Sequence, residues 1–147
     1  MAATRRLTIS MRDREAGSVT RECLRNKRLV YVILADKTLK YAKARSRIAY
    51  IGTTRKGVSR VLGSLAYRAK TILKWRGVRE CHVRLVTCAE LPKVEIWKKL
   101  ERALLVTFRK RFGQVPKCNT QGKRMGSRDV FSYFTRSRVT RVIEELS

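Results

Sequence analysis

Two tyrosines and an arginine in the first half of the chain have the types and spacing that suit phosphate chemistry. Tyr31 lies in one apolar, β-branched run and Tyr50 in a second, where the sequence continues Tyr-Ile-Gly-Thr-Thr. Arg60 comes ten residues after Tyr50, near the start of a predicted helix. Phenol hydroxyls and the planar guanidinium fork are the donors that meet phosphate oxygens. Two phenols on neighbouring strands beside an arginine are therefore more typical of phosphate handling than of packing.

Glu101 is the sharpest physical anomaly of the sequence. On a helix with about 100° per residue, the apolar side chains of that segment fall within roughly 60° of it. A buried carboxylate costs several kcal/mol unless it is paired, protonated or bound to a cation. One interpretation is an ion pair with one of the many arginines, and the other is a metal ligand or general acid/base. The apolar residues of this stripe are Val94, Trp97, Leu104, Leu105 and Phe108.

The charge balance indicates a polyanionic partner. The 147 residues contain 36 Lys plus Arg against 11 Asp plus Glu, a net charge of +25. Such a field attracts nucleic acids, and contacts to phosphates gain free energy by releasing counterions. An anionic membrane is the competing partner, but no long amphipathic basic stretch, no apolar span and no signal-type segment supports it. We expect an intracellular protein, cytoplasmic in a prokaryote or phage-infected host, and nuclear or organellar in a eukaryote.

The four cysteines do not predict a metal site. Cys23, Cys81, Cys88 and Cys118 lie far apart, without a Cys-x-x-Cys pair. This spacing fits zinc poorly, and a disulfide framework is improbable in a reducing compartment. We therefore expect free thiols.

The elements that would position these residues follow from apolar periodicity and from glycine and proline signals. A basic N-terminal arm (1–27) precedes a central domain (28–122) and a C-terminal extension (123–147) that ends in a helix, together forming one structural domain. The predicted strands are 29–34, 48–51 and 81–87, the predicted helices are 57–76, 92–111 and 133–146, and the intervening long loops are 35–46 and 114–128.

The order of these residues resembles the GIY-YIG nuclease superfamily. Leu29-Val30-Tyr31 occupies the place of the first triplet and keeps its tyrosine but not its glycine. Tyr50-Ile51-Gly52 matches the second triplet, and Arg60 has the family spacing. Glu101 matches the metal-holding glutamate, and Asn119 matches the asparagine that closes the motif. The resemblance covers roughly residues 29 to 121, and five elements in order are more specific than any one of them.

The resemblance implies a small α/β domain of the α+β kind, with a three-stranded antiparallel sheet flanked by helices. It also implies hydrolysis of phosphodiester bonds with one divalent ion, Mg²⁺ or Mn²⁺. Glu101 would hold the ion. Tyr50 would take a proton from the attacking water if nearby cations favour the phenolate, with Tyr31 orienting that water or exchanging roles with Tyr50. Arg60 would meet the phosphate, and Asn119 would hold the site together by hydrogen bonds.

Besides the missing glycine of the first triplet, a second position departs from the family pattern. Ser64 occupies the position, four residues after the arginine, where many members have a histidine or tyrosine. Tyr67, Lys56 or the basic loop could substitute for it. The residues expected to contact nucleic acid are Lys40, Lys43, Arg45, Arg55, Lys56, Tyr67 and Lys123.

Two functions follow from these observations. The first is a metal-dependent endonuclease acting on double-stranded or branched DNA, as a monomer or homodimer. The second is a non-catalytic DNA- or RNA-binding protein on a degenerate nuclease fold. For the second, Tyr31 and Tyr50 would be ordinary strand aromatics, Arg60 one more surface charge, and Asn119 a turn residue.

Overall fold

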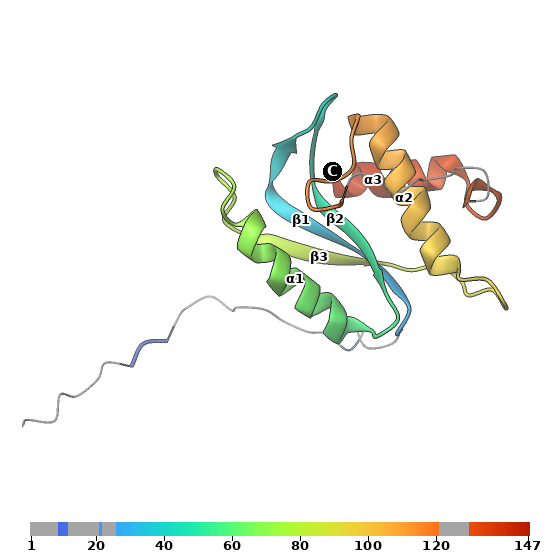
Figure 1. Cartoon of the computed structure of the whole chain (residues 1–147), viewed down its shortest axis with the longest axis horizontal. Coiled ribbons are helices and arrows are strands. Elements are labelled where there is room, and N and C mark those ends of the chain that lie inside the picture. Colours follow the sequence, from blue (N-terminus) through green and yellow to red (C-terminus); the bar gives the residue numbers. More distant parts are fainter. Residues whose placement is uncertain (1–8, 12–20, 22–25, 121–129) are drawn as a thin grey trace, which may run out of the picture.

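A three-stranded antiparallel sheet is the centre of the computed structural model, which describes residues 9–11, 21, 26–120 and 130–147. Its strands are β1 (Leu29–Lys40), β2 (Arg45–Thr54) and β3 (Cys81–Val86), in the spatial order β2-β1-β3. Helix α1 (Val58–Ile72) covers one face, and α2 (Ile96–Phe112) with α3 (Arg136–Leu146) covers the other (Figure 1). The predicted α+β class with a C-terminal helix is confirmed.

The first two strands are longer than predicted, and the expected long loop over 35–46 is wrong. Strand β1 continues to Lys40, and β2 starts at Arg45. Tyr41 N–H donates to Ala44 C=O (2.9 Å) and closes a short turn. Leu39 and Tyr41 are buried although polar residues surround them. Alternation of buried and exposed residues is the strand pattern, and a register irregularity between Leu34 and Leu39 hides it from the sequence.

Helix α2 begins four residues later than predicted. Pro92 and Lys93 form a turn instead of a first helical turn, and Lys93 adopts φ 61. The bridge between Leu91 and Val94 closes this turn. Gly113 ends the helix in the left-handed conformation, with φ 82, as the sequence predicted.

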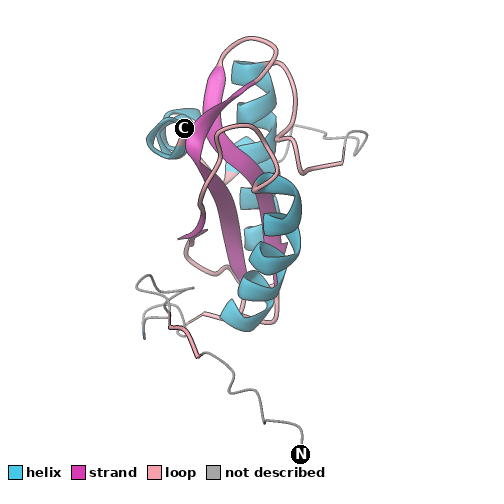
Figure 2. Cartoon of the chain, turned by 90° about the vertical axis from the view of Figure 1, so that its left-hand side faces the viewer, coloured by secondary structure: helices cyan, strands magenta, loops and turns pink. Residues whose placement is uncertain are grey.

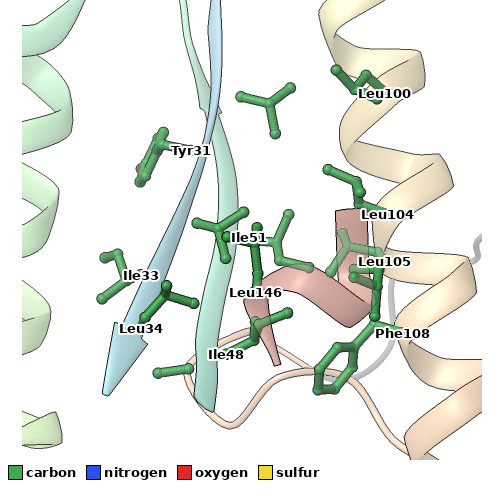
Figure 3. Close-up of a cluster of buried hydrophobic side chains, with 14 of the residues drawn as sticks. Tyr31, Ile33, Leu34, Ile48, Ile51, Leu100, Leu104, Leu105, Phe108 and Leu146 are labelled. Carbon is green, nitrogen blue, oxygen red and sulfur yellow. The ribbon is translucent and has the colours of Figure 1, made fainter. Parts of the chain in front are cut away.

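The main core lies between the sheet and α2. Val30, Val32 and Ile51 have no exposed surface, and Leu104 and Phe108 of α2 are likewise fully buried. Figure 3 shows Ile51 and the leucines of α2 facing one another across this layer, with Leu146 of α3 closing it. Burial of these side chains is the main stabilising term of the fold.

The C-terminus is held against β2 by hydrogen bonds. Arg47 N–H donates to Ser147 C=O (3.2 Å), and Ser46 Oγ donates to Ser147 Oγ (2.9 Å). Figure 2 shows the C-terminus beside the strands. Helix α3 begins at Arg136, later than the predicted 133, because a short 3-10 turn over Val130–Ser132 precedes it.

Most of the predicted N-terminal arm lies outside the described residues, and so does Lys123. None of the helices in the described part of the chain has both the length and the apolar composition needed to cross a membrane.

Candidate active site

The two tyrosines lie together on the face of the sheet that α1 covers. In the antiparallel register Tyr31 pairs with Gly52 and Ile33 pairs with Tyr50, so both phenols project to the same side. Their ring centroids are 5.8 Å apart, at an interplanar angle of 43°. Tyr31 is only 4% exposed, and Figure 3 shows it on the side of β1 toward α1. The predicted proximity of the two phenols is therefore present in the structure.

Gly52 leaves the room that the Tyr50 ring needs. A Cβ at position 52 would come within 2.5 Å of Tyr50 Cε1 and 2.7 Å of the Tyr50 hydroxyl oxygen. Carbon atoms do not approach this closely without displacement of one group. The glycine of the Tyr-Ile-Gly triplet thus has a steric function, and any side chain there would displace the tyrosine.

Ser64 and Arg68 of α1 complete the polar cluster. Tyr31 Oη donates to Ser64 Oγ (2.8 Å), and Arg68 Nη1 donates to the same oxygen (2.8 Å). The guanidinium carbon of Arg68 lies 3.6 Å from the centroid of the Tyr50 ring. Ser64 is 4% exposed, so these bonds form away from solvent, where they are strongest.

Arg60, the arginine expected from the sequence, lies elsewhere. It is exposed, and among the described residues no hydrogen bond, ion pair or ring contact joins it to the tyrosines. Arg68 was missed by the sequence analysis. Its spacing of four residues from Ser64 places both side chains on one helix face, but Arg60 has the same spacing on the other side of Ser64, so the sequence could not choose between them.

Tyr67 does not replace the missing ring at position 64. Its side chain is 71% exposed, and its ring centroid lies 5.9 Å from the Arg68 guanidinium carbon. It therefore lies at the outer rim of the cluster, beside Arg68.

The electrostatics keep the Tyr50 hydroxyl protonated. Burial, then the neighbouring Tyr31, raises the pKa of Tyr50 from 10.0 to about 12. The Arg68 charge opposes this rise, whereas the hydrogen bond with Tyr31 and the Glu101 carboxylate add to it. The condition set by the sequence analysis, that nearby cations favour the phenolate, is not met by the protein alone.

Glu101 is not buried as expected. The residue is partly exposed, whereas Trp97, Leu104 and Phe108 on the same stripe are buried. Its charge adds to the rise in the pKa of Tyr50, after the larger effects of burial and of Tyr31.

Asn119 binds the outer edge of β2. Its Oδ1 accepts from Ile51 N–H (3.0 Å), and its Nδ2 donates to Ile51 C=O (2.8 Å). Cys118 N–H donates to Ala49 C=O (2.9 Å). Asn119 thus mimics a paired strand beside Tyr50, which agrees with the expected contribution by hydrogen bonds.

The donor set suits a magnesium ion better than a structural metal. Among the described residues no group of three or more His, Cys, Asp or Glu side chains could hold an ion. Mg²⁺, however, is commonly held by one or two carboxylates together with waters and substrate phosphates. Glu101 is a partly exposed carboxylate, which fits that requirement.

The other expected nucleic-acid contacts lie at separate places. Arg55 forms an ion pair with Glu95 and lies over the Trp97 ring (5.7 Å), and Lys56 is exposed beside it. Lys40, Lys43 and Arg45 are exposed at the opposite end of the β1–β2 hairpin. The described cysteines, Cys81, Cys88 and Cys118, are free thiols, as expected.

A scan against protein-family models and searches of curated proteins and solved structures find no match to this chain.

Proposed function

We propose that this protein is a metal-dependent endonuclease that hydrolyses phosphodiester bonds in DNA. The observation that carries the proposal is the cluster of two phenols and one guanidinium between the sheet and α1. The ring centroids of Tyr31 and Tyr50 lie 5.8 Å apart, Arg68 stacks on Tyr50, and the charge of Glu101 on α2 adds to the rise in the pKa of Tyr50. Hydrogen-bond donors, a cation and a carboxylate that would bind a metal ion are the parts that phosphoryl chemistry requires.

Glu101 would hold the ion, Mg²⁺ or Mn²⁺. A bound ion supplies a Lewis acid for a phosphate oxygen and a coordinated water of lowered pKa. Asn119 contributes indirectly, because its two hydrogen bonds keep the Ile51 backbone, and so Tyr50 next to it, in place.

Tyr50 acts as a hydrogen-bond donor in this proposal. With a pKa of about 12, only about one molecule in 10⁵ carries a phenolate at neutral pH. A neutral phenol can orient an attacking water or donate to a phosphate oxygen, and the ring of Tyr31 packs beside it, with the ring centroids 5.8 Å apart. The proton of the attacking water then leaves to solvent or hydroxide.

The net charge of +25 supplies affinity for the substrate. Exposed cations outside the cluster, among them Arg60 and Lys56, would contact phosphates away from the scissile bond and position the strand. Because the substrate is DNA, the proposal includes an intracellular location.

The alternative is a non-catalytic nucleic-acid-binding protein. Two observations favour it: the raised pKa of Tyr50 and the exposure of Arg60. This alternative predicts steeply salt-dependent binding and no strand cleavage with any divalent ion.

A nicking assay decides between these functions. Supercoiled plasmid and a branched synthetic DNA are incubated with the protein in Mg²⁺ or Mn²⁺, with and without EDTA. The matched control is Glu101→Gln, purified in parallel. We expect nicking that EDTA abolishes and that Glu101→Gln reduces by at least about 10³-fold, since a metal ion supplies several kcal/mol of transition-state stabilisation.

DNA binding should survive in Glu101→Gln, because the variant removes a negative charge. Cleavage that persists in this variant or in EDTA would overturn the assignment. Salt-dependent binding without cleavage in any ion would support the alternative.

A further inference from the structure

We infer that Arg68 is the positioning residue of this site: one guanidinium holds both the ring of Tyr50 and the hydroxyl to which Tyr31 is anchored. The spacing in the sequence pointed to Arg60, whereas the assignment of Arg68 comes from its contacts in the structure. The part of the inference that concerns cleavage rests on the proposed function, and the part that concerns the ring does not.

The Arg68 side chain makes two contacts that differ in kind. Its guanidinium carbon lies 3.6 Å from the Tyr50 ring centroid, which is close contact for a stacked cation–π pair. Its Nη1 donates to Ser64 Oγ, 2.8 Å away. The hydrogen bond fixes the direction of the guanidinium plane, and the fixed plane then limits where the Tyr50 ring can lie.

The contacts form a closed ring of four side chains. The rings of Tyr50 and Tyr31 are in contact, with centroids 5.8 Å apart, and Tyr31 donates to Ser64. Arg68 donates to Ser64 and stacks on Tyr50. Each phenol is thereby held at two points. Loss of any one member loosens the other three, because the interactions in such a network support one another.

A proton cannot leave the cluster through Arg68. A guanidinium has five N–H donors and no acceptor, and it does not deprotonate in proteins. A proton that moved from Tyr31 to Ser64 would find no acceptor on Arg68. The chain therefore orders the phenols without conducting protons, which makes Arg68 a positioning residue and not a proton-transfer partner.

A lysine could not take this role. Ring stacking and hydrogen bonding at once need a planar group with several donors, whereas an ammonium is a compact point charge. Arg68→Lys should therefore behave like Arg68→Ala, and Arg60→Ala is the matched control on the same helix because its side chain is exposed.

The first test does not depend on cleavage. Ring flipping of Tyr50 is measured by NMR on protein with ¹³C-labelled tyrosine, with Tyr50→Phe to assign the signals. We expect the flip rate of Tyr50 to rise by about tenfold or more in Arg68→Ala and Arg68→Lys, and to stay unchanged in Arg60→Ala. An unchanged flip rate in both Arg68 variants would overturn the inference.

The second test uses cleavage kinetics on plasmid DNA. Displacement of Tyr50 should lower kcat by up to about 10²-fold in Arg68→Ala, with KM within about threefold of wild type. Arg60→Ala should raise KM and leave kcat unchanged. Ethylguanidinium, with an equal concentration of sodium chloride as control, should restore part of the kcat of Arg68→Ala.

The two tests separate the two possible failures. If wild-type protein does not cleave DNA, the proposed function fails, and the flip rates alone decide the inference on Arg68. If wild type cleaves and Arg68→Ala retains full kcat, the inference fails and the nuclease proposal remains.

Discussion

The two faces of the sheet are formed by the same strands but have different roles. Toward α2, strand β1 presents Val30 and Val32, both without exposed surface, to a layer of leucine and phenylalanine side chains. Toward α1, the residue between them, Tyr31, joins a polar cluster with Ser64 and Arg68. One face contributes stability by burial. The other uses strand positions set by that burial to hold its phenols.

This difference implies that substitutions on one face of the sheet should mainly affect stability, and substitutions on the other face should mainly affect the chemistry. Substitutions toward α2 should cost folding free energy and leave the chemistry of each folded molecule unchanged. Substitutions in the polar cluster should change the chemistry more than the stability. The following variants test that separation, starting with the largest expected effect.

Phe108→Ala should be the most destabilising change. Phe108 is fully buried and packs against Tyr41 (5.0 Å between ring centroids) and Phe112 (4.4 Å). Truncation of a core phenylalanine leaves a cavity and costs about 3–5 kcal/mol. Urea unfolding measures the loss, and nicking is compared per folded molecule, which should match wild type.

Leu73→Ala is the control for Phe108→Ala, because Leu73 is 44% exposed and its truncation should change stability by less than about 0.5 kcal/mol. A loss below about 1 kcal/mol for Phe108→Ala would show that the α2 face is not the stabilising one.

Gly52→Ala should damage the polar cluster more than the fold. The new methyl group would lie 2.5 Å from Tyr50 Cε1, so the ring must move. We expect a loss of unfolding free energy of about 1–3 kcal/mol from overpacking, and a fall in cleavage of up to about 10²-fold from displacement of the phenol.

Gly63→Ala provides the matched comparison, since a Cβ there meets nothing within 4 Å. This second glycine lies inside α1, and its replacement should stabilise by about 0.5–1 kcal/mol without an effect on cleavage. Equal cleavage by Gly52→Ala and wild type would contradict the steric function assigned to Gly52.

The smallest expected effect concerns alkaline pH. The folded pKa of Tyr50 is raised to about 12, above the value near ~10 of an unfolded tyrosine. Its contribution to stability is therefore complete below about pH 10 and is lost as pH rises toward about 12. Tyr50→Phe, which cannot ionise, should lose less stability than wild type between about pH 9 and about pH 11.

Urea midpoints at the two pH values provide the comparison for Tyr50→Phe. Burial also raises the pKa of Tyr41, so the variant should keep the part of the slope that comes from Tyr41. A slope in Tyr50→Phe identical to that of wild type would mean that Tyr50 titrates normally.

Most of the fold could be predicted from the periodicity of the apolar residues and from the glycine and proline residues that end helices and strands. The apolar runs around Tyr31 and Tyr50 predicted the first two strands, and Gly113 predicted the end of α2. The error over 35–46 arose because Leu39 and Tyr41, each isolated among lysines, are buried only through pairing with β2 and contact with α2. Such pairing partners lie on another segment, so local pattern cannot reveal them.

The sequence by itself determined the β1–β2 hairpin with its two phenols and its glycine, because these depend on residue type and spacing along neighbouring strands. It also indicated Asn119, which reaches the hairpin from the segment after α2. Tertiary structure alone decided that Arg68, two turns beyond Arg60, meets Tyr50, and that Glu101 is partly exposed. The physical reason is that Arg60 and Arg68 each lie one helical turn from Ser64, and only the position of the helix along the sheet decides which of them contacts Tyr50.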